Sequence, residues 1–410
     1  MSIPTVTVLA INAGSSSIKF ALYALPDLTL RTHGEISGIG GAASCFTIEE
    51  LSGAPCKRSF PIPEPVTAVQ VLVDWLTEHV DGAQLGCIVH RIVHGGASLR
   101  ATGDIDDAML ATLYALRRDD PQHLPQEIHL VEALRRHFPG STLTRHIACF
   151  DSSFHANMPA VASMLPVPRR YHDAGIKRLG YHGLSCEYLM HRLRALEPEL
   201  AGGKVILAHL GGGASVTAVE GGVSRDTTMG LSPSGGIPMA SRSGDLDPGF
   251  AWHCLHHEQM SAPALQHMLT HESGLRGIAG GSGDMAQLLA REAHAPHAAE
   301  AVALFCYQAG KAVCAMAGAI DGIDVLVFAG GIGENAQLVR ARIGERLAHL
   351  GVLLDPHAND AHHDVISAPA SRVLVRVIRT DEQWMLADNA RRLLDTHRSA
   401  GKAAPQGTPQ

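Results

Sequence analysis

The 410-residue chain lacks several features that mark whole classes of protein. Its eight cysteines include no C-x-x-C pair, which argues against a zinc ribbon or a disulfide framework and favours reduced, mostly buried thiols. Aromatic residues make up only 4% of the sequence. No run of about 18 apolar residues occurs, so we expect no membrane-spanning helix and no membrane partner. The N-terminal residues lack the basic and apolar segments of a signal peptide, which predicts a cytoplasmic protein.

Positive charge is also scarce. The chain has 33 Lys and Arg against 40 Asp and Glu, a net charge of −7, and no cluster of basic residues. This excludes an electrostatic surface for nucleic acid, so no nucleic-acid partner is expected. A hydrophobic share of 46% and a charged share of 18% indicate a globular chain rather than a disordered one. At roughly 100–200 residues per domain, the length predicts two or three domains.

A pattern of strand, small-residue turn and strand occurs twice. Apolar, β-branched runs flank turns rich in glycine and serine, which is typical of a hairpin. The first hairpin has strands 6–11 and 18–23 around the turn 12–17, and the second has strands 205–210 and 216–219 around the turn 211–215. This repetition predicts two related domains, each opening with a hairpin.

Other segments complete an α/β pattern. A third glycine-rich turn, 329–335, follows a strand at 324–328 and leads into a helix expected over 336–350. Helices are also predicted over 67–78, 106–118, 184–196 and 298–320, and from about 383 after a strand at 373–378. Strands mixed with helices in this way predict an α/β fold class.

The three glycine- and serine-rich turns are the main chemical signal. Such turns expose backbone N–H groups and let an anion approach closely, which suits a phosphate group. The sequence has no Walker A motif, and no G-x-G-x-x-G follows the first strand, which argues against a P-loop or Rossmann site. A single turn of this kind is more often only a tight hairpin, but three in one chain favour phosphate binding.

Charged side chains follow two of the apolar runs. Arg91, beside paired glycines, could fork onto a carboxylate or phosphate; the alternative is a surface ion pair. Asp151 could hold Mg²⁺ or orient a nucleophile; the alternative is a helix N-cap. Both alternatives remain open from these residues alone.

Three further candidates lie in turns. His182 stands between glycines, where its ring can project to stabilise charge or transfer a proton. Arg242 lies in a polar loop that is either functional or merely connecting. Glu382 could bind Mg²⁺ or belong to the acidic first turn of a helix. Three other histidines are interpreted as surface residues of a helix: His253, His256 and His257.

As an ordered set, these motifs resemble those of the acetate/propionate kinase family. The resemblance runs from Val6 to about Arg392, nearly the whole chain. Its motifs are, in order, INAGSSSIKF, HRIVHGG, CFDSSFH, GYHGLS, HLGGGAS, SRSGDLDPG, SGDM, FAGGIGEN and TDEQ. Nine such blocks in this order do not arise by chance.

The resemblance implies a fold of the actin, Hsp70 and sugar-kinase type. Two duplicated α/β domains, ribonuclease H-like and with mixed sheets, would surround a nucleotide cleft. The first would comprise residues 1–150 plus 385–410. The second would comprise residues 151–384 and carry nucleotide-binding and dimer surfaces. A homodimer is expected on the same grounds.

The family's reaction is implied as well. It transfers the γ-phosphoryl group of ATP to acetate by direct, reversible, in-line transfer, which makes acetyl phosphate and ADP. The expected cofactors are ATP and Mg²⁺, with Mn²⁺ as a substitute. The alternative is a kinase of propionate or another short-chain carboxylate with the same mechanism. Such chemistry requires positioning and charge neutralisation rather than covalent catalysis.

The resemblance also implies roles for individual residues. Arg91 and Arg242 would clamp the substrate and the transferring group, and His182 and Arg242 would stabilise the transition state. Asp151 would be catalytic and help Glu382 and Asn12 to place the metal ion. The expected substrate contacts are Arg91, Val93, Gln122, Tyr181 and Pro233, with His123 in support. The expected nucleotide contacts are Asn12, Ser15, Ser17, Lys19, His209, Gly211, Gly212, Gly213, Gly331, Ile332 and Asn335.

Three positions depart from the family's pattern. Gly212 stands where the family usually has Asn, which removes a side-chain hydrogen bond to the transferring phosphate and leaves backbone donors. Gln122 replaces a Leu, and Tyr181 replaces a Phe, which makes the acyl pocket more polar or narrower. Because one methylene changes binding in an apolar pocket by only about 1–3 kcal/mol, acetate and propionate should overlap as substrates.

Three other functions compete with this reading. A sugar or glycerol kinase of the same fold needs a general-base Asp, and two arginines favour an anionic acceptor instead. An actin- or Hsp70-like nucleotide switch would leave those arginines unexplained. A protein that binds nucleotide but has lost the transfer activity is the third, because of Gly212.

Overall fold

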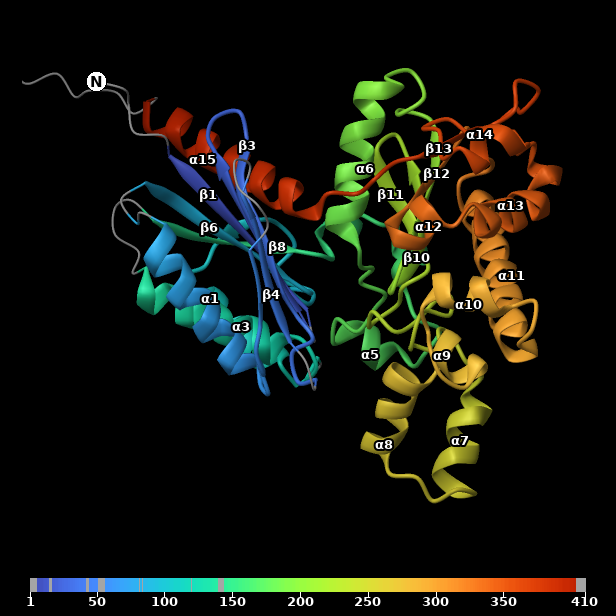
Figure 1. Ribbon diagram of the computed structural model, residues 1–410, viewed down its shortest axis with the longest axis horizontal. Coiled ribbons are helices and arrows are strands. Elements are labelled where there is room, and N and C mark those ends of the chain that lie inside the picture. Colours follow the sequence, from blue (N-terminus) through green and yellow to red (C-terminus); the bar gives the residue numbers. More distant parts are fainter. Residues whose placement is uncertain are drawn as a thin grey trace, which may run out of the picture. The chain divides into compact units, whose positions relative to one another are not determined.

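The structure is a computed structural model. It describes residues 6–14, 17–41, 44–50, 56–80, 82, 84–118, 120–138 and 144–402. The chain divides into two compact units (Figure 1). Unit 1 comprises Met1–Ser153 and Asp381–Gln410, and unit 2 comprises Phe154–Thr380. Each unit is built on its own β-sheet.

Unit 1 contains an eight-stranded mixed sheet in the order β5-β4-β3-β2-β1-β6-β8-β7. Its strands are β1 (Thr7–Ala13), β2 (Ser17–Ala24), β3 (Thr29–Ser37), β4 (Cys45–Glu50), β5 (Cys56–Ser59), β6 (Leu85–Ile92), β7 (Gly103–Asp104) and β8 (Arg145–Phe150). β1, β6 and β8 run parallel, and the remaining pairs are antiparallel. The carboxyl ends of these three parallel strands therefore meet at one edge.

Helices cover both faces of this sheet (Figure 1). α1 (Pro65–His79) and α3 (Leu124–His137) pack on one face, where Leu72 and Leu130 join a core with Leu9. α2 (Asp107–Leu116) packs against α3. α15 (Glu382–Lys402) lies against β1 and β6 on the other face and buries Met385, Leu386, Ala387 and Ala390, which fixes the position of its first turn.

Unit 2 repeats the plan with five strands in the order β11-β10-β9-β12-β13. They are β9 (Lys204–Leu210), β10 (Ala214–Glu220), β11 (Val223–Thr227), β12 (Val325–Ala329) and β13 (Leu374–Val377). β9, β12 and β13 are parallel, whereas β9–β10 is an antiparallel hairpin, as β1–β2 is in unit 1. In each sheet the first strand of the hairpin also pairs with a parallel strand on its other side: β1 with β6, and β9 with β12.

The helices of unit 2 position the ends of these strands. α6 (Gly183–Leu196) packs Leu189 and Leu193 against Val205 and Val327. α11 (Pro296–Ala319) packs against β9 and β10. The remaining short elements are η1 (Ser153–His155, at the boundary of the units), α4 (Ala160–Ser163), α5 (Arg169–Asp173), α7 (Pro248–His256), α8 (Ala262–His267), η2 (Met268–Glu272), α9 (Gly274–Ala279), α10 (Met285–Arg291), α12 (Gly330–Asn335), α13 (Gln337–Arg346), η3 (Ala348–Leu350) and α14 (Pro356–Asp360).

The predictions for residues 329–350 are wrong. The segment 329–335 is not a turn, because residues from Gly330 onward form α12, and the helix expected over 336–350 is divided into α13 and η3. Gly330 enters α12 with a φ of 75°, a conformation that glycine adopts without strain. By length and composition alone, α11 is the one helix among the described residues that could cross a membrane. Half of that stretch is buried within the protein, as in a core helix.

The thiol prediction is confirmed. All eight cysteines are free, and five are buried: Cys87, Cys149, Cys186, Cys254 and Cys306. Burial raises the pKa of Cys87 to about 12 and that of Cys306 to about 11, so both remain thiols at neutral pH.

Candidate active site

Four predicted side chains meet at the edge of the unit 1 sheet where β1, β6 and β8 end. Asn12 is near the end of β1, Arg91 near the end of β6, and Asp151 directly follows β8. The backbone N–H of Asp151 donates to the carbonyl of Ile92 at 2.8 Å, which aligns the two strand ends. Glu382 joins them from the first turn of α15. We call these four residues the arginine–carboxylate set.

Arg91 makes the central ion pair of this set. Its Nη2 donates to Oδ2 of Asp151 at 3.0 Å. The Asp151 carboxylate is 1% exposed and the Arg91 side chain 16% exposed, so neither is a surface group. The surface ion pair that the sequence left open for Arg91 is therefore wrong, because its partner Asp151 is buried.

Asn12 and Glu382 form the second contact of the set. The Asn12 amide Nδ2 donates to Oε2 of Glu382 at 2.9 Å. Burial raises the pKa of Glu382, and the nearby negative charge of Asp151 raises it further, against the opposing charges of Arg91 and Lys19. Lys19 is exposed and lies opposite Asn12 in the β1–β2 register. A cation placed among these oxygens would relieve the repulsion between the two carboxylates.

Glu127 on α3 is a member of this neighbourhood that the sequence analysis missed. Its Oε2 accepts the backbone N–H of Val93 at 3.0 Å, and its Oε1 lies 3.7 Å from Nη1 of Arg91. The signal was present in the sequence, because an acidic residue stood in the apolar stripe of α3 with Leu130 and Leu134. A carboxylate buried at such a position needs a polar partner.

Asp120 organises the segment before α3. Its carboxylate accepts the backbone N–H groups of Gln122 and His123 and lies 2.9 Å from Nδ1 of His123. Nε2 of His94 lies 3.9 Å away on the other side. Burial alone would raise the pKa of Asp120, but the hydrogen bond and charge of His123 lower it. The predicted residues Gln122 and His123 are therefore held by an acid that the sequence analysis did not single out.

In unit 2, His182 stands at the start of α6 beside the second hairpin. It has a φ of 59°, the left-handed region that few side-chain-bearing residues adopt. Its Nδ1 lies 3.0 Å from Oγ of Ser215, and its ring centroid lies 4.2 Å from that of His209. Ser185 in turn holds Nδ1 of His209 at 2.8 Å.

The turn Gly211–Gly213 lies directly against these groups. A Cβ built on Gly213 would lie 2.9 Å from Nε2 of His182 and 3.6 Å from Nη1 of Arg242, so only glycine allows this approach. A Cβ on Gly212 would meet nothing within 4 Å. We call His182, His209, Arg242 and this turn the histidine–glycine set.

The loop that follows β11 carries Pro233 and Arg242, and Tyr181, just before α6, contacts this loop. Arg242 Nη1 donates to the carbonyl of Pro233 at 3.0 Å, and the Tyr181 hydroxyl donates to the carbonyl of Leu231 at 2.6 Å. Tyr181 is 1% exposed. Its hydroxyl, the atom that a Phe lacks, thus anchors the loop that carries Pro233.

α12 brings the remaining predicted residues next to the glycine turn. A Cβ built on Gly211 would lie 3.5 Å from the backbone N of Gly331. Oε1 of Glu334 accepts the backbone N–H of Gly330 at 3.0 Å, and Nδ2 of Asn335 donates to the carbonyl of Gly331 at 2.9 Å. Gly331, Ile332 and Asn335 therefore lie on one fixed helical turn.

The placement of the predicted site residues is thus as follows. Unit 1 brings together Asn12, Lys19, Arg91, Val93, Gln122, His123, Asp151 and Glu382, and unit 2 brings together Tyr181, His182, His209, Gly211, Gly212, Gly213, Pro233, Arg242, Gly331, Ile332 and Asn335. Ser17 begins β2, and its carbonyl accepts the N–H of Gly14. Ser15 lies outside the described residues. The three histidines interpreted as surface residues, at 253, 256 and 257, are exposed.

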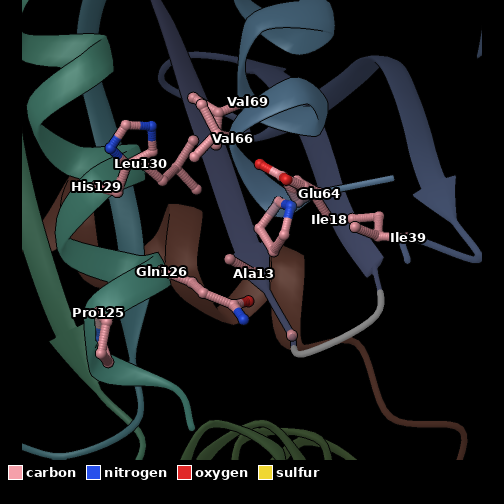
Figure 2. A pocket seen from close by; sticks show the side chains of 12 residues that line it. Ala13, Ile18, Ile39, Glu64, Val66, Val69, Pro125, Gln126, His129 and Leu130 are labelled. Carbon is pink, nitrogen blue, oxygen red and sulfur yellow. The ribbon is translucent and has the colours of Figure 1, made fainter. Parts of the chain in front are cut away.

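Unit 1 also contains a pocket of about 400 Å³ (Figure 2). It is lined mostly by apolar residues of the first hairpin, α1 and α3, with Glu64, Gln126 and His129 as its polar groups. No member of the arginine–carboxylate set lines it. Figure 2 shows that Gln126, His129 and Leu130 of α3 border this pocket. The neighbouring Glu127 does not line it and instead contacts Val93 and Arg91 at the strand ends.

Solved structures define the class of this protein. A Porphyromonas gingivalis acetate kinase matches with a TM-score of 0.85 and 29% identity, over 95% of this chain and 100% of that one. A Francisella tularensis propionate kinase matches with a TM-score of 0.87 and 30% identity, over 94% and 98% of the two chains. The chain thus has the actin-like ATPase fold of these kinases, with two mixed sheets, and the predicted fold class is confirmed.

Sequence comparison assigns the family. The family model described as "Acetokinase family" matches residues 7–388, so the chain belongs to the acetokinase family. An acetate kinase of Rhodopseudomonas palustris is 40% identical over 94% of this chain and 98% of its own length. One of Rhizobium meliloti is 37% identical over 92% and 96%.

Proposed function

We propose that this chain phosphorylates acetate with ATP to give acetyl phosphate and ADP, reversibly and by direct in-line transfer. The observation that carries the proposal is the match to acetate kinases over nearly the whole length of both chains. Propionate is the alternative substrate, because one solved relative is a propionate kinase. We also propose that the protein acts in the cytoplasm, as the sequence analysis expects.

The arginine–carboxylate set is suited to the acceptor. We propose that Arg91 binds the acetate carboxylate, which would share the guanidinium with Asp151. The proposed substrate contacts are Val93, Gln122, Tyr181 and Pro233.

The histidine–glycine set is suited to phosphate. We propose that the backbone N–H groups of Gly211–Gly213 bind the phosphates, as do Asn12, Ser15, Ser17 and Lys19 on the first hairpin. His182 and Arg242 would neutralise charge that develops on the transferring group. His209 would support the phosphate contacts, and Gly331, Ile332 and Asn335 would hold the adenosine.

A divalent metal ion belongs to the chemistry of the family. We propose Mg²⁺, with Mn²⁺ as a substitute, and assign Asn12, Asp151 and Glu382 to its binding, directly or through water. Their oxygens are the ligands that Mg²⁺ prefers, and burial together with the charge of Asp151 raises the pKa of Glu382, which a bound cation would lower. Among the described residues no three His, Cys, Asp or Glu enclose a metal site, which suits an ion that keeps water and phosphate ligands. When bound, the ion would neutralise phosphate charge.

Unit 2 also carries a candidate dimer surface, and we propose a homodimer. Large apolar side chains are exposed on α7 and α11: Phe250 and Trp252 on α7, with 42% and 61% exposed, and Tyr307 on α11, with 47% exposed. Large apolar side chains exposed in this way favour burial against a partner. Light scattering that gives the 43.4 kDa mass of one chain would contradict the proposal.

Trapping of the acyl phosphate with hydroxylamine tests the reaction. Purified protein would be incubated with ATP, Mg²⁺ and, in parallel, formate, acetate, propionate or butyrate. We expect the largest signal with acetate and a smaller one with propionate. A maximum with propionate would keep the mechanism and change the substrate. No signal with any of the four acids would refute the proposed function.

Gly212→Asn tests the phosphate role of the second hairpin. The open space around the Gly212 Cβ position admits the side chain, and an added hydrogen bond to a charged phosphate is worth about 1.5–3 kcal/mol. We therefore expect kcat/KM for acetate to rise about tenfold. Gly202→Asn is the matched control, because a Cβ there also meets nothing within 4 Å. An unchanged or lower value for Gly212→Asn, with the control unchanged, would contradict the role.

A further inference from the structure

Glu127 is a buried acid beside Arg91 in which one carboxyl oxygen has no hydrogen-bond partner among the described residues. The side chain is 2% exposed. Its Oε2 accepts the Val93 N–H, whereas Oε1 has no hydrogen-bond partner among the described residues. The nearest cationic atom to Oε1 is Nη1 of Arg91 at 3.7 Å, too far for a hydrogen bond.

Arg91 is shared unequally between two carboxylates. It gives its short hydrogen bond to Asp151 and only a longer ion pair to Glu127. A guanidinium has five N–H donors in a fixed fork, so small rotations of Arg91 change which carboxylate it serves. Any substrate carboxylate that binds Arg91 therefore meets a buried competitor on α3.

We propose that Glu127 is a positioning residue that competes with the substrate carboxylate for Arg91. The inference rests on the proposed role of Arg91 in binding that carboxylate. When Glu127 carries a negative charge, it holds the guanidinium and weakens carboxylate binding. When it is neutral, Arg91 is released to the substrate. Meanwhile the hydrogen bond to the Val93 N–H keeps Glu127 in place in both states.

The charges around Glu127 decide when it is neutral. β6 presents Arg91, the residue after β8 presents Asp151, the segment before α3 presents Asp120, and α15 presents Glu382 to Arg91. His94 and His123 face Asp120 rather than Glu127.

Burial dominates this balance and raises the pKa of Glu127 to about 8, against the lowering effects of Arg91 and the Val93 N–H. Glu127 is therefore mostly protonated at pH 7 and mostly ionised at about pH 9. Acetate itself stays ionised over that whole range.

Glu127→Gln tests the proposal, because the amide oxygen can still accept the Val93 N–H but cannot ionise. In the wild type we expect KM for acetate to rise about tenfold from pH 7 to pH 9 as Glu127 ionises. In the variant, KM for acetate should rise less than about twofold over the same range. KM for ATP should change with pH in the same way in both proteins. Glu132→Gln is the matched control on the same helix, where Glu132 is hydrogen-bonded to Tyr114. It should follow the wild type.

Two outcomes would overturn the inference. One is an equal rise of KM for acetate in the wild type and in Glu127→Gln. The other is a variant that raises KM for acetate and for ATP alike, which indicates a general structural role. A wild type without any acyl phosphate, or an Arg91→Ala variant with an unchanged KM for acetate, would instead refute the proposed function.

Thermal unfolding gives a second, activity-free readout. The pKa of Glu127 is raised in the folded state, so its stabilising contribution is complete below the ordinary carboxyl value and is lost as pH rises toward 8. Relative to Glu127→Gln, the wild type should therefore lose stability between about pH 5 and pH 8 and hold a constant difference above that. A constant difference over the whole range would contradict ionisation of Glu127.

Discussion

Arg91→Ala is expected to lower kcat/KM for acetate by about 1,000-fold, because the variant loses a charge-assisted, two-pronged contact to the acceptor. The loss should be largest in KM for acetate, and KM for ATP should change little. The substitution also leaves the buried carboxyl groups of Asp151 and Glu127 without their cation. Removal of one partner of a buried pair costs about 3 kcal/mol of stability, so folding must be checked by circular dichroism.

Two companion variants make the result interpretable. Arg91→Lys keeps the positive charge between Asp151 and Glu127 and thus the fold, but a compact ammonium cannot form the two-pronged contact. It should lose most of the acetate affinity while it remains folded. Arg145→Ala is the control, because Arg145 pairs with Asp104 at a more exposed position of the same sheet. If Arg91→Lys were as active as the wild type, Arg91 would not bind the acceptor.

The hairpins were predictable because their signals are local. Apolar, β-branched runs around small-residue turns mark β1–β2 and β9–β10 without any knowledge of the rest of the chain. α12 was not predictable in the same way. Its glycine-rich sequence has low helix propensity, but side-chain contacts stabilise it: Glu334 accepts the N–H of Gly330 within the helix, and Arg340 of α13 donates to the carbonyls of Gly333 and Glu334.

The candidate site, too, was predictable only where its signals are local. Arg91 and Asp151 could be found because strand ends and glycine pairs are visible in the sequence, but their mutual contact depends on the order β1-β6-β8, which no local pattern gives. Glu127 and Asp120 act through α3 and the segment before it. Their roles appear only once α3 packs on β6 and brings an acid against the Val93 N–H.

His182 is placed by three constraints that together leave its ring little freedom. The left-handed backbone at the start of α6 aims it, Oγ of Ser215 lies 3.0 Å from its Nδ1, and the ring of His209 packs beside it. Nε2 then lies over the backbone of Gly213, next to Arg242. A group fixed in this way costs no reorganisation when charge develops on a phosphoryl group, which is the condition for effective transition-state stabilisation.

His182→Ala should therefore lower kcat by about 100- to 1,000-fold while KM for acetate changes less than about threefold. His182→Asn is the sharper variant, because Asn tolerates the left-handed backbone and its amide can reach Ser215, yet it has no atom at the Nε2 position. It should lose as much kcat as the alanine variant. His253→Ala, at an exposed position on α7, is the control and should remain fully active. A loss confined to KM, or full activity in His182→Asn, would show that Nε2 does not act on the transferring group.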